Sequence, residues 1–133
     1  MKYILSCLTI LVLMAGVIQA PTTEYYSVVC RITAYSSKER FEHNKTALGK
    51  SANNEKGVAT HKSFLPFGTK IEYKGQVRIV DDRVPSRSAK KFNYKVVDFR
   101  YYQSLDSKPK TRAVNRELRK KFDGGWGVIK IYR

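Results

Sequence analysis

Apolar and β-branched residues recur in six short clusters along the chain, separated by stretches rich in Gly, Pro, Asn, Asp and Ser. Such clusters between turn-forming stretches are typical of β-strands. The clusters are Tyr26–Ala34, Gly57–Ala59, Thr69–Tyr73, Val77–Val80, Tyr94–Tyr102 and Val128–Tyr132. The turn-prone stretches include Ser36–Lys45, Ser51–Lys56, Lys74–Gly75 and Pro85–Lys91. The pattern predicts an all-β fold, a compact six-stranded β-barrel, and disfavours alternating strand and helix units.

One segment departs from the strand pattern. Between residues 111 and 122, the apolar side chains of Val114, Leu118 and Phe122 follow helical spacing, and Gly124-Gly125 comes directly afterwards. Glycine ends helices readily, so we predict one short helix here. Its basic face is most simply a solvated surface, with polymer binding as the alternative. The cations concerned are Arg112, Arg116, Arg119 and Lys120.

The amino terminus has the pattern of a secretory signal peptide. Lys2 precedes an uncharged apolar run from Ile4 to Ile18, and the small residues at its end are Ala15, Gly16 and Ala20. The run is shorter than the ~20 apolar residues of a membrane-spanning helix. We predict a signal peptide over residues 1–20 and one domain over residues 21–133, with cleavage nearer Gly16 as an alternative because Pro21 follows Ala20.

The charge balance indicates an anionic partner. The chain has 26 Lys and Arg against 11 Asp and Glu, and loss of Lys2 with the leader leaves a net charge of +14. Nucleic acid, acidic lipid and anionic wall polymer all fit this charge. Export argues against nucleic acid, and the sequence has no recognition-helix, zinc or stacked-aromatic motif. An anionic wall polymer is therefore the predicted partner.

Several kinds of catalytic site lack the residues they need. Cys7 leaves with the leader, so Cys30 has no intramolecular disulfide partner and is most simply a small buried group. His43, His61 and Cys30 lack the close spacing of a zinc site, and neither histidine sits in a motif with a nucleophile. Carboxylate chemistry remains. Glycosidic bond cleavage needs little more than a carboxylic acid beside the leaving oxygen.

Three carboxylates stand out by their context. Asp81 and Asp82 end the strand over residues 77–80, and Asp98 lies between apolar residues of another strand, where an acid is disfavoured. A turn-forming pair is the structural alternative for Asp81 and Asp82. For Asp98 the structural alternative is a salt bridge to Arg100 or Arg83.

A series of motifs resembles, in order, the three-aspartate (3D) domain and the rare lipoprotein A family. The motifs that look most like the second family are His61 followed by Leu65-Pro66-Phe67-Gly68-Thr69, and Asp81-Asp82-Arg83 before Pro85. The resemblance covers nearly all of the chain after the leader and ends with Trp126–Ile131. The other matching stretches are Thr33–Tyr35, Thr46–Gly49, Val58–Thr60, Val80–Asp82 and Val97–Phe99.

The resemblance implies a six-stranded double-psi β-barrel that acts on peptidoglycan as a lytic transglycosylase. In such an enzyme one acid protonates the glycosidic oxygen and then takes a proton from the muramic acid 6-hydroxyl. By the resemblance, Asp98 is the acid/base, Asp82 its carboxylate neighbour and His61 an orienting partner, although Asp82 is the acid if the rare lipoprotein A pattern holds. The residues assigned to substrate binding are Tyr35, Thr46 and Arg83.

Two departures from the family pattern keep a second hypothesis open. Val84 stands where a glycine is expected soon after Asp82, and the segment from Asp82 to Asp98 is longer than in the 3D family and rich in cations. A barrel that binds glycan without cleaving it, as in expansin-like proteins, is the alternative. A cationic antimicrobial protein acting on membranes is the third hypothesis. The aromatic candidates for stacking on sugar rings are Tyr35, Tyr94, Tyr101 and Trp126.

Taken together, these patterns predict a secreted or periplasmic protein associated with the cell wall. It is expected to bind peptidoglycan strands or another anionic wall polymer, as a monomer without cofactor or metal. Nucleic acid is not an expected partner, and no membrane span is expected once the leader is removed.

Overall fold

The computed structural model describes residues 23–36, 45–101, 108–121 and 123–133, so the predicted leader lies outside the described residues. The strands are β1 (Tyr25–Ser36), β2 (Gly57–Thr60), β3 (Lys70–Tyr73), β4 (Gln76–Arg83), β5 (Val96–Tyr101) and β6 (Trp126–Tyr132). The helical segments are α1 (Ser86–Ala89), the 3-10 turn η2 (Lys90–Phe92), α2 (Lys108–Lys121) and the 3-10 turn η3 (Asp123–Gly125). The described chain is therefore mostly β, as predicted.

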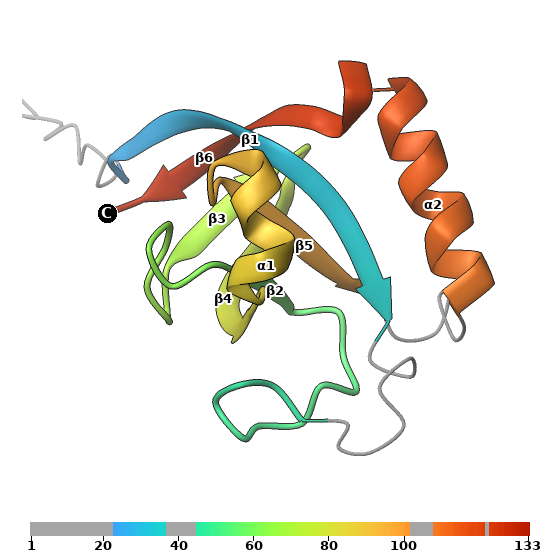
Figure 1. The fold of residues 1–133 in the computed structure, drawn as a ribbon. Coiled ribbons are helices and arrows are strands. Elements are labelled where there is room, and N and C mark those ends of the chain that lie inside the picture. Colours follow the sequence, from blue (N-terminus) through green and yellow to red (C-terminus); the bar gives the residue numbers. More distant parts are fainter. Residues whose placement is uncertain (1–22, 37–44, 102–107, 122) are drawn as a thin grey trace, which may run out of the picture.

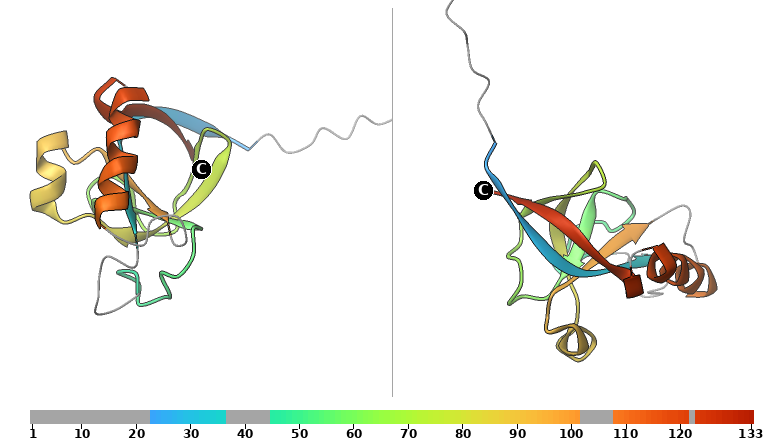
Figure 2. Two further views of the ribbon diagram at one scale, coloured as in Figure 1. Left: turned by 90° about the vertical axis from the view of Figure 1, so that its right-hand side faces the viewer. Right: turned by 90° about the horizontal axis from the view of Figure 1, so that it is seen from above.

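The six strands form one closed ring of hydrogen-bonded neighbours in the order β1-β5-β2-β4-β3-β6, with β6 back on β1 (Figures 1 and 2). The pairs β1–β5 and β2–β4 are parallel, and the other four are antiparallel. The long strand β1 serves two neighbours. Its first part pairs with β6 and its second with β5, and Arg31 is the residue that pairs with both.

The core lies inside this ring. Every strand contributes at least one inward-facing apolar side chain. In β1, β5 and β6 two such side chains lie at alternate positions, because successive side chains of a strand point to opposite faces. The buried core residues are Cys30, Ile32, Val58, Leu65, Ile71, Val80, Val97, Phe99, Ile129 and Ile131. A second, outer cluster of Ala59, Val84, Ala89 and Val96 packs beneath α1, with Tyr35, Phe92 and Tyr94 beside it. This outer cluster underlies the candidate site.

The predicted turn over Pro85–Lys91 is wrong, because α1 and η2 form there. The carbonyl of Pro85 accepts hydrogen bonds from the N–H groups of Ser88 and Ala89 and so closes the first helical turn. Ala89 is fully buried in the outer cluster. Burial of this one side chain stabilises a helix too short to be visible as an amphipathic pattern.

The helix predicted over residues 111–122 is confirmed as α2, which begins three residues earlier at Lys108. Phe122 lies outside the described residues. Pro109 sits in the first turn, where its missing N–H is tolerated. Asn115 attaches α2 to β1, because its side chain accepts from the N–H of Ala34 and donates to the carbonyl of the same residue. Leu118 packs against the core, and the four predicted cations of this helix are exposed.

Cys30 is a fully buried free cysteine. Burial raises the pKa of its thiol from the ordinary value of 9.0 to about 12, so the nucleophilic thiolate is scarce at neutral pH. A cysteine nucleophile at this position therefore has no support. In the described ranges, no helix has both the length and the apolar character needed to cross a bilayer.

Candidate functional site

Two of the predicted site carboxylates flank one residue of the sheet. Ala59 on β2 pairs with Asp98 on β5 at one side and with Asp82 on β4 at the other. On the far side of β5, Asp98 pairs with Thr33 of β1. Since neighbouring strands lie about 4.8 Å apart, the Cα atoms of Asp82 and Asp98 are roughly 10 Å apart. The fold thus brings together two acids that lie in separate motifs of the sequence.

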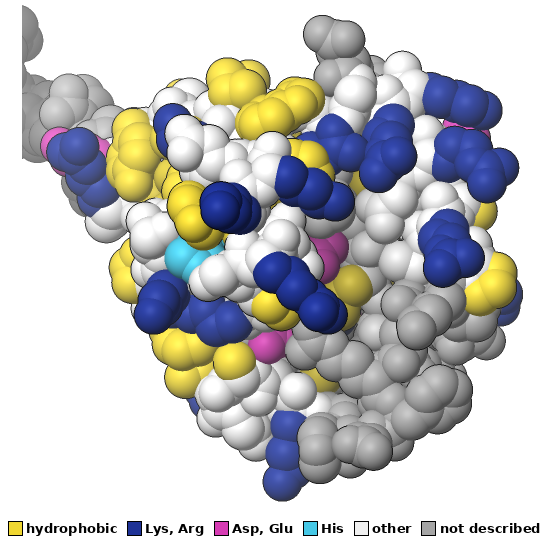
Figure 3. All heavy atoms as spheres, in the orientation of Figure 1, with side chains coloured by type: hydrophobic (Ala, Val, Ile, Leu, Met, Phe, Trp, Pro, Cys, Tyr) yellow, Lys and Arg dark blue, Asp and Glu magenta, His cyan; other side chains and the backbone are white. Residues whose placement is uncertain are grey.

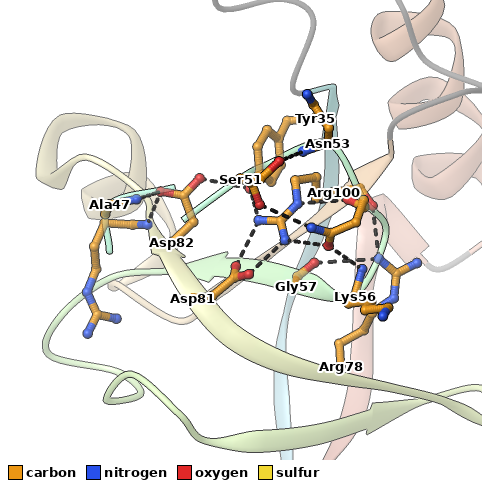
Figure 4. Close-up of polar contacts among 12 residues, drawn as sticks. Tyr35, Ala47, Ser51, Asn53, Lys56, Gly57, Arg78, Asp81, Asp82 and Arg100 are labelled. Carbon is orange, nitrogen blue, oxygen red and sulfur yellow. Dashed lines mark hydrogen bonds and ion pairs between the residues drawn. The ribbon is translucent and has the colours of Figure 1, made fainter. Parts of the chain in front are cut away.

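A β-bulge places Asp81 and Asp82 close to the same network. Val58 pairs with Val80, but the next residue of β2, Ala59, pairs with Asp82, so that Asp81 is the extra residue of β4. A bulge bends the strand and re-aims its side chains. Both carboxylates reach groups on the outer face of the ring, as Figure 4 shows for Asp81 beside Arg100 and Asp82 beside Ala47.

Asp82 is buried, with 2% of its surface exposed, and its carboxylate accepts three hydrogen bonds. The Tyr35 hydroxyl donates to Oδ2 at 2.9 Å, and the N–H groups of Ala47 and Arg83 donate to Oδ1, each at 2.9 Å. Burial, followed by the charge of Asp82, raises the pKa of Tyr35 far above its usual range. The phenol therefore stays protonated as a donor. Asp82 is an acceptor that holds the 45–50 loop against the ring.

Asp81 forms a bidentate ion pair with Arg100, whose side chain is completely buried (Figure 4). The two guanidinium nitrogens donate to the two carboxylate oxygens at 2.8 and 2.7 Å. Arg100 also donates to the carbonyl and to the side-chain oxygen of Asn54, and to the Tyr35 hydroxyl. Burial alone would lower the pKa of Arg100, but the bonds to Asp81 and Tyr35 outweigh it and the pKa is raised.

This pairing bears on the structural alternative considered for Asp98. Arg100 is committed to Asp81, and the Arg83 guanidinium donates to Thr60 Oγ1 and to the carbonyl of Leu65. The structural alternative, a salt bridge from Asp98 to Arg100 or Arg83, is therefore wrong. Gly57 explains why the network fits, because a Cβ at this position would collide with the Asp81 carboxylate and the Arg100 guanidinium.

Asp98 is only partly buried and lines a pocket of about 220 Å³. The Thr33 hydroxyl donates to its Oδ1 at 2.8 Å and so orients the carboxylate. The other lining residues include Arg31, Lys91, Phe92, Asn115 and Arg119. The pocket therefore combines one acid, one aromatic ring and three cations, and it lies between the ring of strands, η2 and α2.

The polar contacts of His61 are with two serines, not with Asp82 or Asp98. Its Nε2 lies 2.9 Å from the Ser86 hydroxyl, and its Nδ1 lies 2.7 Å from the Ser63 hydroxyl and accepts from the Ser63 N–H at 3.2 Å. Nδ1 is therefore the acceptor, and Nε2 donates to Ser86. The ring packs on Tyr94, with centroids 4.6 Å apart. His61 connects the loop after β2 to the start of α1.

The three predicted substrate-binding residues have different positions. Tyr35 is committed to the Asp82 network. The Arg83 guanidinium covers the Phe67 ring, 3.7 Å from its centroid, and burial lowers its pKa. Thr46 is buried in the turn that presents Ala47 to Asp82, and its hydroxyl has no hydrogen-bond partner among the described residues.

Within the described ranges, no group of three or more His, Cys, Asp or Glu residues is placed to hold a metal ion. His43, whose spacing from Cys30 and His61 argues against a zinc site, lies outside those ranges.

The sequence pattern did not predict the network around Arg100 or the pocket wall formed by Arg31. A signal for Arg100 existed, because it lies two residues after Asp98 and so on the same face of β5. Its partner Asp81 was considered only as a turn residue or a catalytic acid. Asn54 accepts two hydrogen bonds from the Arg100 guanidinium. It lies in a stretch whose sequence predicted only a turn.

Comparison with protein-family models, with curated proteins and with solved structures finds no match for this chain.

Proposed function

We propose that this chain is an exported protein that binds peptidoglycan strands and cleaves them as a lytic transglycosylase, with Asp98 as the acid/base. The observation that carries the proposal is the pocket in which a partly exposed carboxylate faces an aromatic wall and several cations. A glycan strand needs an apolar surface for its sugar faces, and its charged substituents need cations.

The proposed fold type is the double-psi β-barrel. Two parallel strand pairs, β1–β5 and β2–β4, joined by an antiparallel pair in a closed six-stranded ring support this refinement. The motif series that resembles the 3D and rare lipoprotein A families supports it independently. It is the resemblance that suggests peptidoglycan as the substrate.

Exposure separates the roles of the two acids. Asp82 is 2% exposed and is surrounded by three donors, so a glycosidic oxygen does not reach it without rearrangement of the 45–50 loop. Asp98 lines the open pocket, where substrate can reach it. A general acid must lie within hydrogen-bond reach of the oxygen that it protonates. We therefore assign the acid to Asp98 and a positioning role to Asp82.

The proposed reaction needs one carboxyl group. Protonated Asp98 gives its proton to the glycosidic oxygen as the bond from that oxygen to the anomeric carbon breaks. The resulting carboxylate then takes the proton of the muramic acid 6-hydroxyl, whose oxygen bonds to the same carbon and closes an anhydro ring. Thr33 orients the carboxyl group for both transfers through its bond to Oδ1.

Trp126 is the best placed of the four aromatic candidates for a sugar platform. It is 40% exposed, and its ring packs edge-on against Phe92, which lines the Asp98 pocket. Tyr35 serves the Asp82 network and Tyr94 packs on His61. Tyr101 packs against the core.

The reaction is tested by mass spectrometry of fragments released from purified sacculi. We expect fragments with anhydro-muramic acid ends, because ring closure replaces attack by water. Fragments with reducing ends would indicate hydrolysis and contradict the mechanism. Sacculi that retain the protein but release no fragment would favour the non-catalytic hypothesis below.

Replacing Trp126 with Ala is expected to weaken binding to sacculi by roughly 5-fold to 10-fold, because aromatic contacts of this kind contribute about 1 kcal/mol or more. Cosedimentation over a range of sacculus concentrations measures the change. The matched control is Tyr25→Ala, which removes another exposed aromatic ring at the opposite end of the β1–β6 ladder. Equal losses in the two variants would contradict a platform at Trp126.

A non-catalytic wall-binding module of the expansin type is the second candidate. It is favoured by the three cations around Asp98, which suit retention of an anionic polymer without bond cleavage. The fragment analysis described above separates the two candidates.

Both candidates predict that wall binding depends on salt. A net charge of +14 after loss of the leader attracts an anionic wall, and ions screen this attraction beyond a Debye length of about 8 Å at physiological ionic strength. We expect retention on sacculi to fall strongly between low and high salt. Retention that is unchanged over this range would contradict an electrostatic contribution.

A further inference from the structure

Arg31 occupies an unusual position in the ring of strands. It pairs with Trp126 of β6 and with Val96 of β5, at the point where β1 changes from one neighbour to the other. Only 6% of its surface is exposed, and it lines the same pocket as Asp98. Its side chain is on the face of β1 opposite to the core residues Cys30 and Ile32.

The guanidinium group of Arg31 is held between two neighbours. Its Cζ lies 5.0 Å from the centroid of the Phe92 ring. On the other side is Gly125, with φ of +87°, where a Cβ would come within 2.9 Å of the guanidinium. A side chain at position 125 would therefore be strained by the backbone and would also displace Arg31. This arrangement fixes the direction of the guanidinium before any ligand binds.

The charge of Arg31 is not neutralised by an ion pair with any described residue, and its buried Nε has no hydrogen-bond partner there. Burial and then the positive charge of Arg119 lower the pKa of Arg31. Asp98 lies in the same pocket, but Lys91 and Arg119 line it as well, so the cations outnumber this carboxylate three to one. Loss of hydration destabilises a buried, unpaired cation, and a bound anion would offset much of that destabilisation.

The cations continue along α2. A second hollow of about 300 Å³ is lined by Arg112, Asn115, Arg116 and Arg119, and it shares Asn115 and Arg119 with the Asp98 pocket. In Figure 3, Lys and Arg side chains are spread over the visible face, with several of them on the α2 side, and few acidic side chains lie among them. We call Arg31, Lys91, Arg112, Arg116 and Arg119 together the basic groove.

We propose that the basic groove binds an oxyanion, a carboxylate or phosphate group carried by the wall polymer, with the Arg31 guanidinium as its anchor. Guanidinium groups bind both anions through paired N–H donors, and a planar group already held in place loses little freedom on binding. That the anion belongs to the wall polymer rests on the proposed function. The capacity to bind a free anion does not.

The first experiment titrates the protein with inorganic phosphate and, separately, with acetate, followed by NMR chemical shifts. We expect saturable binding of at least one anion, with the largest shifts at Arg31 and along α2. Arg31→Gln and Arg119→Gln should each weaken it about 10-fold or more, since charge-assisted hydrogen bonds are lost. Arg133→Gln is the matched control, because it removes the same charge from an exposed position on the Tyr26 ring.

Equal weakening by Arg133→Gln, or no saturable binding by the wild type, would overturn the proposal. Circular dichroism checks the fold of each variant. If Arg31→Gln does not fold, the exposed Arg119→Gln decides the result, because a surface substitution on α2 leaves the core intact.

The second experiment identifies the source of the anion with two kinds of treated sacculi. One lacks the phosphodiester-linked polymers, and in the other the carboxylates are blocked. Removal of phosphodiester-linked polymers should abolish the difference between wild type and Arg119→Gln if the ligand is a phosphate. Conversion of the wall carboxylates to neutral amides should abolish it if the ligand is a carboxylate. A difference that survives both treatments would overturn a wall substituent as the ligand. Wild-type protein that binds phosphate or acetate but no sacculi would overturn the proposed function and leave the anion site intact.

Discussion

Replacing Asp81 with Ala is expected to lower the free energy of unfolding by about 3–5 kcal/mol, because it leaves the fully buried Arg100 guanidinium without its counter-ion. The remaining acceptors, Asn54 and the Tyr35 hydroxyl, carry no negative charge to balance it. Denaturant unfolding followed by circular dichroism measures the loss. This is a large part of the total stability of a small domain.

Two further variants test the physical reason for this loss. The double variant Asp81→Ala/Arg100→Met should recover much of the stability, since removing both charges removes the unpaired one. Glu117→Ala breaks the ion pair between Glu117 and Lys120, whose side chains are 69% and 67% exposed. This change should alter the free energy of unfolding little. Equal losses in Asp81→Ala and Glu117→Ala would show that burial of Arg100 does not determine the effect.

Asp98→Asn is expected to reduce the release of anhydro-muropeptides by about 10²-fold to 10⁴-fold, because the amide keeps the size of the carboxyl group but transfers no proton. Binding to sacculi and the unfolding free energy should stay close to wild type, since Asp98 lines an open pocket. Initial rates from the mass-spectrometric assay measure the change. Glu117→Gln, a carboxyl-to-amide change on the exposed surface of α2, is the matched control.

Asp82→Asn distinguishes the 3D pattern, in which Asp98 is the acid, from the rare lipoprotein A pattern, in which Asp82 is the acid. An amide nitrogen in place of one carboxylate oxygen would face a donor, either Tyr35 or the two backbone N–H groups, so a stability loss of about 1–3 kcal/mol is expected. Loss of cleavage with loss of stability fits a positioning role. If Asp98→Asn releases fragments as fast as the wild type while Asp82→Asn releases none and remains fully folded, Asp82 is the acid.

The sequence alone was sufficient for the strands and for α2, because both leave a local pattern in the sequence. Clusters of apolar and β-branched residues between turn-forming stretches predicted all six strands within a few residues of their observed ends, and the spacing of Val114 and Leu118 predicted α2. The turn predicted at Lys74–Gly75 is confirmed, and it joins the antiparallel strands β3 and β4. Its two residues have positive φ angles of 51° and 76°, as a tight hairpin turn requires.

The helix α1 was missed because its stability is tertiary. Four residues have no periodicity to recognise, and it is the burial of Ala89 in the outer cluster that stabilises the turn. The pairing of Arg100 with Asp81 was missed for a similar reason. Alternation places both residues on strands, but a bulge opposite Ala59 decides which way the Asp81 side chain points.

The sequence by itself determined which residue types are available for chemistry: carboxylates in strand contexts, a large excess of cations and a single cysteine after the predicted leader. Only the tertiary structure decided how they are combined. It buried Asp82 among three donors, left Asp98 open to a pocket, and placed Arg31 beside Arg119 from a distant helix. Burial and charge proximity depend on which strands become neighbours when the ring closes, and local periodicity does not encode that order.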